Sequence, residues 1–532
     1  MPSISPNAFD FAIIATYFIA TIFVGWIFRV KAKSPSEFFH ARRSLPTWVT
    51  AIAFVAANCG ALEIVGIVSA TAKYGTQTLH FYLIGAVPAM LFLALFMMPI
   101  YMGSRALTVP EFLKLRYDES TRALNIGCSV LMMVLVSGIS LYALAQVLRT
   151  FLGWTFTETT ISAAVIVFIY VSVGGLTATI YNEVIQFVLI LLGLAPLAVY
   201  ILRDFQDLHG LAAKLDPAMI HTWVGLPISS PQAARVDVLG TAMGLGFVLG
   251  FGYWCTDFLL VQRALAARTT AGVISTPLIA ALVKLAFPVV VVIPGLAAAI
   301  LFVHQPGFRF DQSLPSLMLR YYGHGLLGFG ITAILASLMS GLAGNINAIT
   351  TIWTHDVYRA SIAPAESDRH YVIIGRLSTF VAILLSVATA YFALSFSNIM
   401  DYLQLLFSLF NAPLFATFLL GMFTTWVTPK AGFWGLLIGT LTSIAHNLAY
   451  RMHSIRYGSD MGANFYGAIF AFTVCFVLTI AISTVTPAKP LESLANLTFW
   501  TSSAREHRLP LGALALALVA ALLFAVLSVW LR

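Results

Sequence analysis

Long apolar runs, separated by short polar segments, fill almost the whole chain. A helix of about 20 apolar residues crosses the hydrocarbon core of a bilayer. Applied to this chain, that length predicts an all-α integral membrane protein with about fourteen membrane-spanning helices. We expect them at 9–29, 47–73, 78–102, 121–150, 157–174, 178–202, 237–262, 272–303, 326–352, 371–395, 398–426, 430–450, 463–485 and 509–531.

Two of the predicted helices are interrupted by small and polar residues in their middle. The second contains AANCG at Ala56–Gly60, and the seventh contains GFGYW at Gly250–Trp254. The two lie five helices apart, which indicates two repeats of opposite orientation. Interrupted helices at matching positions of inverted repeats are typical of a transport site at the bilayer midplane. Glycine pairs also serve plain helix packing, but the pattern favours transport.

The composition agrees with a membrane protein. Hydrophobic residues make up 60% of the chain and charged residues 9%, whereas soluble proteins carry about 25% charged residues. The net charge is +8, but the basic residues lie in short loops and form no dense tract that would indicate nucleic-acid binding. The four cysteines lie inside apolar runs without metal-ligand spacing, so we expect them to be core residues.

The basic loops predict the orientation of the chain. FRVKAKSPSEFFHARRSLP follows the first helix and should be cytoplasmic, which places the N-terminus outside. With an even number of helices the C-terminus also lies outside, as do the linkers 203–236 and 304–325. The basic segment RMHSIRYGSD is a mild exception on the outer side. The N-terminus lacks the basic region of a signal peptide, so the first helix should be retained. We expect a multi-pass protein of the cell membrane, in bacteria the inner membrane.

Four ionisable residues lie deep in predicted spans: Glu63, Glu183, Asp257 and Lys284. An unpaired charge at that depth is costly, so each needs a partner or water. Lys284 lies nearest the middle of its span, which favours a functional or gating role. Glu63 follows the interruption of the second helix and should face the same cavity. For Glu183 and Asp257, a structural pair or a helix-end position remains the alternative.

The ninth helix, ILASLMSGLAGNINAITTIW, is rich in small and polar residues. Close helix packing accounts for part of this pattern. The sharper interpretation is a cation site, because carbonyls freed by an unwound helix, together with hydroxyls from a neighbouring helix, supply the oxygen ligands that sodium needs. The second helix would provide the carbonyls, and the ninth would provide Ser340.

Several long segments, in the right order, resemble the solute:sodium symporter family, which includes the sodium/glucose and sodium/galactose cotransporters. The segments are YVSVGGLTATIYNEVIQ (170–186), GYWCTDFLLVQRALAAR (252–268), KLAFPVVVVIPG (284–295) and NAITTIWTHDVYR (347–359). The resemblance runs from about residue 10 to about residue 450. It implies a LeuT-type fold, with two inverted five-helix repeats that work by alternating access, driven by the sodium gradient.

On this resemblance the chain divides into five parts. They are an extra helix with its basic cytoplasmic loop at 1–40, a first inverted repeat at 41–205 (helices two to six), an outer loop at 206–236, a second inverted repeat at 237–428 (helices seven to eleven) and peripheral C-terminal helices at 429–532.

Carried over position by position, the resemblance also implies a sodium site. Its ligands would be the carbonyls of Ala56 and Cys59, the carbonyl of Ser337 and the hydroxyl of Ser340. The family commonly has a second hydroxyl where this chain has Gly341, so one ligand is missing. Glu183 stands where the galactose transporter has an Asp on the proposed ion exit path, so the charge is kept.

The solute site resembles that of the family in part. Asn58, Lys284 and Gln404 match positions that contact the sugar, Tyr253 matches the inner gate tyrosine, and Trp254 matches the aromatic beside it. Elsewhere the pattern departs: Glu63 replaces a Gln, Phe81 and Tyr82 replace a Tyr–Glu pair, Gly85 replaces a Ser, and Gly250 replaces an Asn. The substrate-binding candidates are therefore Asn58, Glu63, Tyr82, Lys284 and Gln404, in a layout for which galactose is not assumed.

These observations predict a secondary transporter and not an enzyme. It would couple sodium, as the co-transported ion, to the uptake of a small polar organic solute, sugar-like by preference. The alternative is a proton-coupled or uncoupled carrier of the same fold for an organic acid, amino acid or vitamin, which Gly341 and Glu63 would suit. The histidines are scattered and no HExxH or CxxC motif occurs, which disfavours an enzyme. We expect the solute and the lipid bilayer as partners, no nucleic acid, and a monomer or weak oligomer.

Overall fold

The computed structural model describes residues 6–28, 44–223, 236–394, 396, 398–502 and 509–530. Throughout these residues the regular structure is helical, and the β-type pairing is limited to one bridge between Leu45 and Ala267. Helices suit a bilayer because the bilayer core holds no water to bond with backbone N–H and C=O groups. In a helix these groups bond to one another.

The first part of the chain forms a series of helices that is broken near its start. Its members are α1 (Ala8–Phe28), α3 (Thr47–Asn58), η2 (Ala61–Gly66), α4 (Ile67–Tyr74), η3 (Gly75–Phe81), α5 (Val87–Phe92), η4 (Leu93–Met97), α6 (Met98–Ser104), α7 (Val109–Arg116), α8 (Glu119–Leu152) and α9 (Phe156–Asp204). Two short helices, α10 (Leu208–Ala212) and α11 (Pro217–Ile220), follow in the linker.

The second part forms a comparable series and ends in peripheral helices. Its members are η6 (Gly240–Leu249), α12 (Gly250–Thr256), α13 (Phe258–Leu265), α14 (Thr270–Ala286), α15 (Pro288–Leu301), η7 (Phe310–Gln312), α16 (Ser313–Tyr321), α17 (Leu326–Thr351), η8 (Ile352–Ile362), α18 (Asp368–Ala393), α19 (Ile399–Phe423), α20 (Pro429–Arg451), α21 (Asp460–Val485), η9 (Leu491–Leu494) and α22 (Leu511–Trp530).

The number of membrane crossings is only partly defined by length and composition. In the described part of the chain nine helices are long and apolar enough to cross, or up to 11 when each bent pair counts as one span. The prediction of fourteen therefore stays a prediction. The spans expected at 157–174 and 178–202 both fall within the single helix α9, and the span expected at 78–102 is divided by turns at 82–86.

Two bent helix pairs stand out. α3 and the helical segment that begins at Glu63 meet at 53°, and η6–α12 meets α13 at 51°. The first bend follows Asn58, within the segment that the sequence predicted. The second differs from the prediction, because the helix continues through Gly250–Trp254 and breaks at Asp257. Gly250 serves packing instead, since a Cβ there would lie 2.5 Å from the carbonyl oxygen of Gly85.

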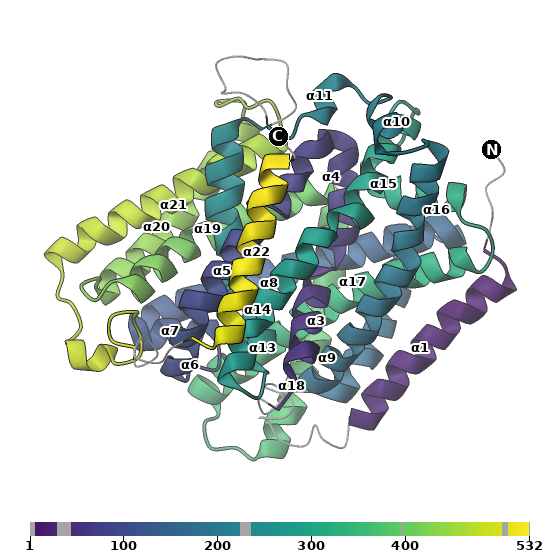
Figure 1. The fold of residues 1–532 in the computed structure, drawn as a ribbon. Coiled ribbons are helices and arrows are strands. Elements are labelled where there is room, and N and C mark those ends of the chain that lie inside the picture. Colours follow the sequence, from purple (N-terminus) through teal and green to yellow (C-terminus); the bar gives the residue numbers. More distant parts are fainter. Residues whose placement is uncertain are drawn as a thin grey trace.

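The helices α17 and α19 form the centre of the bundle. Each is 89% buried along its most apolar stretch, whereas α21 and α22 are 28% and 17% buried. α17 packs against α8, α9 and α3, and α19 packs against α12, α20 and α21. Figure 1 shows α1 and α22 on the outside of this bundle, with α22 beside α14.

The two ends of the bundle are easily told apart. Figure 1 shows α10 and α11 at one end and α7 at the other. We call these the outer and the inner end, after the orientation that the basic loops predict. At the outer end, the Thr76 hydroxyl donates to the carbonyls of Met219 and Ile220, which ties η3 to α11.

Candidate transport site

The break after α3 turns two main-chain carbonyls towards α17. Cys59 ends the helix with φ −72° and ψ 40°, and Gly60 N–H bonds back to the Asn58 carbonyl at 2.8 Å. The Ser340 hydroxyl donates to the carbonyl of Ala56 at 3.2 Å, and the Ser337 hydroxyl donates to the carbonyl of Cys59. The structure thus brings the four residues of the predicted sodium site together across one interface.

This interface is tight because glycines face each other across it. A Cβ on Gly341 would lie 3.1 Å from the Cα of Gly60, and a Cβ on Gly60 would meet Gly341 in the same way. Gly341, which the sequence analysis treated as a missing ligand, therefore lets α17 approach the break. The hydroxyl of Ser337 contacts the broken helix, while the role of its carbonyl as a sodium ligand stays a prediction.

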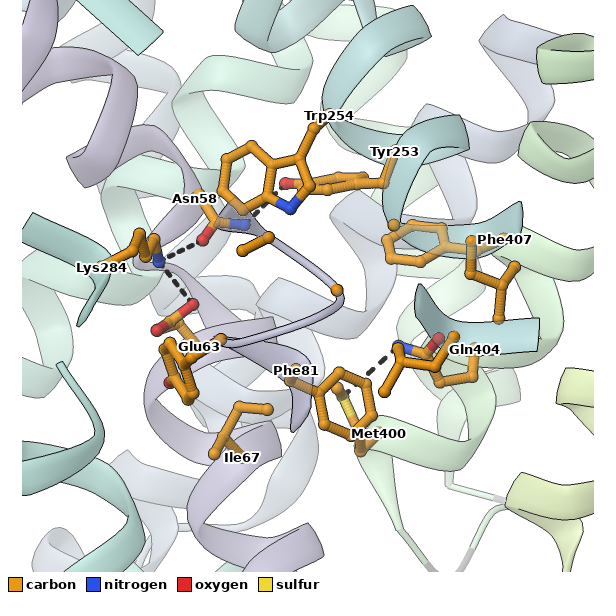
Figure 2. A pocket seen from close by; sticks show the side chains of 16 residues that line it. Asn58, Glu63, Ile67, Phe81, Tyr253, Trp254, Lys284, Met400, Gln404 and Phe407 are labelled. Carbon is orange, nitrogen blue, oxygen red and sulfur yellow. Dashed lines mark hydrogen bonds and ion pairs between the residues drawn. The ribbon is translucent and has the colours of Figure 1, made fainter. Parts of the chain in front are cut away.

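A cavity lies beside the same break, between α3–η2, α12, α14 and α19 (Figure 2). It encloses about 50 Å³, room for a few water molecules, whereas pockets that hold drug-sized ligands span about 300–1,000 Å³. The described conformation is therefore closed around the site. The lining residues are Asn58, Glu63, Ile67, Phe81, Tyr82, Gly85, Ala86, Leu245, Leu249, Gly250, Tyr253, Trp254, Lys284, Met400, Gln404 and Phe407.

All five substrate-binding candidates and both gate candidates line this cavity. They come from segments more than 300 residues apart in the sequence, since Asn58 ends α3 and Gln404 lies on α19. Figure 2 labels all of these candidates except Tyr82, and it shows the labelled side chains arranged around one space. Their positions agree with a common site, while the role of each remains a prediction.

A continuous polar network crosses the cavity wall. The ammonium of Lys284 lies 2.6 Å from the carboxylate of Glu63 and donates to the amide oxygen of Asn58. The Asn58 amide nitrogen then donates to the Tyr253 hydroxyl at 2.8 Å. Lys284 and Glu63 are buried, with side chains 1% and 5% exposed. A buried charge is tolerated when it is paired in this way.

Aromatic rings surround the network. The Lys284 ammonium lies 5.7 Å from the ring centroid of Trp254 and 5.9 Å from that of Tyr82. Tyr253 stacks on Phe407 with ring centroids 4.9 Å apart. Such rings add cation–π attraction to the ammonium and offer flat faces to a ligand. Phe407 is a lining residue that the sequence analysis did not single out. A phenylalanine in an apolar helix is common, so nothing in the sequence distinguished it from a core residue.

Glu183 and Asp257 lie outside the lining of this cavity. Glu183 forms a fully buried ion pair with Arg263 at 2.6 Å, which joins α9 to α13. Asp257 caps α13 by accepting a hydrogen bond from the Leu259 N–H at 2.9 Å. These are the paired and helix-end positions that the sequence left open as alternatives. The ion pair of Glu183 does not test its proposed role on an ion path, which stays a prediction.

The outer end is closed above the cavity by contacts that sequence reasoning missed. Asp401, in the first turn of α19, binds Lys73 at 2.7 Å and accepts from the Tyr74 hydroxyl at 2.9 Å. Asp311 of η7 accepts from Ser69 and, at 3.3 Å, from Tyr142. Asp401 could have been noticed, because it is an acid within a predicted span. Its partners on α4 are 328 and 327 residues away in the sequence and could not have been identified from it.

Comparison with known proteins agrees with this architecture. A model of the sodium:solute symporter family matches residues 38–439. Sodium/glucose cotransporter 2 of Rattus norvegicus is 27% identical over 94% of this chain and 82% of its own length. The sodium/glucose cotransporter of Vibrio parahaemolyticus is 27% identical over 82% of this chain and 83% of its own. Sodium/myo-inositol cotransporter 2 of Mus musculus is 26% identical over 94% and 80%.

Solved structures show the same fold. A sodium-coupled sialic acid symporter in an outward-open state matches with a TM-score of 0.76 at 20% identity, covering 91% of this chain and 99% of its own. A nucleobase-cation-symport-1 family transporter in a closed conformation matches with a TM-score of 0.53 at 12% identity, covering 88% and 98%. At this level of identity the likeness concerns the fold alone.

A helical membrane bundle with two bent helices beside a small buried cavity is typical of a secondary transporter, and the relatives named above are transporters and not enzymes. The chain belongs to the sodium:solute symporter family. Sodium is accordingly the co-transported ion, and the protein is a multi-pass membrane transporter.

Proposed function

We propose that this protein carries a small, polar, sugar-like solute together with sodium by alternating access. The observation that carries the proposal is the buried network of Lys284, Glu63 and Asn58 in the cavity wall, flanked by the ring of Trp254. Ammonium, carboxylate and amide groups bind hydroxyls, and an aromatic face packs against the C–H face of a sugar ring. The relatives include sodium/glucose and sodium/myo-inositol cotransporters, which supports the same class of solute for this chain.

We further propose that sodium binds between the break after α3 and α17. The carbonyls of Ala56 and Cys59 would be ligands, together with the Ser337 carbonyl and the Ser340 hydroxyl. The contacts that support this are the hydrogen bonds between the two serine hydroxyls and the two carbonyls. Sodium would take the place of these hydrogen bonds. Asn58 lies between the two carbonyl residues and faces the solute cavity, so a single segment would couple the ion to the solute.

The remaining elements fit alternating access between two inverted repeats, which we propose as 41–205 and 237–428, within a bundle of about fourteen spans. Tyr253 and Trp254 would form the gate on the inner side of the solute, and Glu183 would lie on the path by which the ion leaves. In this proposal both termini face outward in a bacterial inner membrane, and the protein acts as a monomer or weak oligomer.

Uptake into proteoliposomes tests the proposal. Radiolabelled glucose, galactose and myo-inositol are offered with an inward sodium gradient, with potassium in place of sodium, and with a pH gradient alone. We expect accumulation of at least one solute with sodium and little without it. Uptake that is indifferent to sodium would refute the coupling, and uptake driven by the pH gradient would favour the proton-coupled alternative.

A further inference from the structure

The charge in the solute cavity is balanced within the cavity itself. Among the described lining residues, Lys284 is the only cationic side chain and Glu63 the only acidic one. Their charged atoms lie 2.6 Å apart, and both side chains are almost completely buried. The lining therefore has no net charge as long as the pair is intact.

The pair leaves acceptor oxygens open in the lining. Oε1 of Glu63 and Oε1 of Gln404 have no hydrogen-bond partner among the described residues. Two donors of Lys284 are directed to Glu63 and Asn58, and the hydroxyl of Tyr82, which can donate as well as accept, also lines the cavity. A hydroxyl of a solute can donate to a free acceptor oxygen, but a carboxylate only accepts. An acidic solute would thus place its charge beside that of Glu63, and no second cationic side chain among the described lining residues would balance it.

We infer that the Glu63–Lys284 pair makes the cavity selective for neutral, hydroxyl-rich solutes and excludes their carboxylate analogues. The inference rests on the proposed function and names the class of solute that the same cavity takes. Glu63 is the residue that sets the selectivity. With Gln at this position the charge of Lys284 would be uncompensated, and in a buried site an unpaired cation attracts an anion strongly.

Matched pairs of sugars test the inference on the purified, full-length protein. Binding of D-glucose and D-glucuronate, and of D-galactose and D-galacturonate, is measured by thermal shift and by competition in sodium. D-glucuronamide serves as the neutral isostere of the acid. The variants are Glu63→Gln, the double variant Glu63→Gln/Lys284→Gln, which restores neutrality, and Asp10→Asn, which removes a buried acid of α1 outside the cavity lining.

We expect the wild type to bind a neutral sugar but not its uronate. Glu63→Gln should bind the uronate about ten- to hundredfold more tightly than the wild type does, because the like charge is gone. The double variant and Asp10→Asn should not gain uronate binding. Retained binding of the neutral sugar or of glucuronamide by Glu63→Gln would show that the variant is folded. If Glu63→Gln binds neither the neutral sugar nor glucuronamide, its folding is tested in another way. A cooperative thermal melt and a melting temperature that rises with sodium would show that the variant is folded.

The outcomes separate the inference from the proposed function. Equal binding of sugar and uronate by the wild type, or no gain of uronate binding in a folded Glu63→Gln, would overturn the inference and leave sugar transport standing. A wild type that none of the neutral sugars stabilises would overturn the proposed function, and the inference with it.

Discussion

Single atoms on α17 decide how the broken helix is held. Ser337 and Ser340 occupy one face of the helix and donate to the carbonyls of Cys59 and Ala56, while Gly341 presents no side chain. A carbonyl that leaves a helical ladder needs another partner when it is buried. The serine hydroxyls meet that need in the described conformation, and we propose that sodium meets it during transport.

Replacing Ser340 by Ala should weaken sodium binding. The change removes a proposed ligand and leaves the Ala56 carbonyl without its 3.2 Å hydrogen bond. We expect at least about a tenfold loss of apparent sodium affinity, since each 1.4 kcal/mol corresponds to a factor of ten. A sodium titration followed by thermal shift measures it. Ser386→Ala is the matched control, because that hydroxyl is equally buried but bonds only within α18. Equal sodium affinities in both variants would contradict the proposed site.

Gly341→Ala should loosen the same interface by overpacking. The added Cβ would lie 3.1 Å from the Cα of Gly60, so α17 and the broken segment must separate. We expect a loss of about 1–3 kcal/mol in the free energy of unfolding, seen as a lower melting temperature in detergent. Gly127→Ala in α8 is the control, because nothing lies within 4 Å of its Cβ, and an alanine there should stabilise the helix slightly. Similar melting temperatures for the two variants would show that the contact is easily relieved.

Individual elements are joined at the outer end by buried acids. The short helix η7 carries Asp311, which accepts hydrogen bonds from Ser69 of α4, from Tyr142 of α8 and from the N–H of Ile399 at the start of α19. One carboxyl thus connects three helices above the solute cavity. Burial raises the pKa of Asp311 to about 6, and these hydrogen bonds offset only part of that effect.

The stability of this junction should fall as the pH rises from about 4 to about 6. Below pH 4 the carboxyl of Asp311 is protonated in both the folded and the unfolded chain. Between these values the folded state keeps a proton that the unfolded chain has released, so ionisation costs folding free energy, in total roughly 2–3 kcal/mol.

Melting temperatures at pH 4.5 and pH 7 measure this effect in the wild type and in Asp311→Asn. The asparagine does not titrate, so the variant should lose less stability than the wild type between the two pH values. Parallel profiles would show that Asp311 contributes nothing to the pH dependence.

At the scale of the whole molecule, the described conformation leaves no room for the solute. The cavity is much smaller than a sugar pocket, and α4 is attached to α19 by the contacts of Asp401 with Lys73 and Tyr74. In the alternating access that we propose, the end that we call outer opens, so these contacts would break in each cycle. Their strength helps to set the balance between the closed and the outward-open state.

Asp401→Asn should therefore shift the population towards the outward-open state. A loss of about 1 kcal/mol in the closed state changes the ratio of the two states about fivefold. Cys59 is fully buried, and its Sγ lies 4.0 Å from Nζ of the lining residue Lys284. Its rate of labelling by a membrane-impermeant thiol reagent therefore reports the opening. Mass spectrometry separates its labelling from that of the other three cysteines.

Asp237→Asn provides the control for this experiment. Asp237 also lies at the outer end, but its carboxylate binds Tyr466 and the N–H of Gly240, and among the described residues it makes no hydrogen bond or ion pair with α4. Its replacement should leave the labelling rate of Cys59 unchanged. An unchanged rate in Asp401→Asn as well would indicate that the ion pair does not hold the outer end closed.

The sequence by itself determined the all-helical membrane class and the break after Asn58, and its resemblance to a known family identified the family and the substrate and gate candidates that line the cavity. The class and the break follow from local properties, because apolar runs of spanning length, small residues within them and rare buried charges are visible along the chain. It placed the second break too early, because a glycine in a helix has the same signature whether it bends the helix or, like Gly250, admits the backbone of another one.

Only the tertiary structure decided which charges pair and which close contact the glycine at position 341 allows. Glu63 could have faced a solute alone, but folding places Lys284, 221 residues later, within 2.6 Å of it. Gly341 stands where the family commonly has a hydroxyl, and folding places Gly60 against it. Asp401 and Asp311 bind partners on distant helices. Pairing and close approach depend on how helices pack in three dimensions, and one helix's sequence does not record which neighbour it will meet.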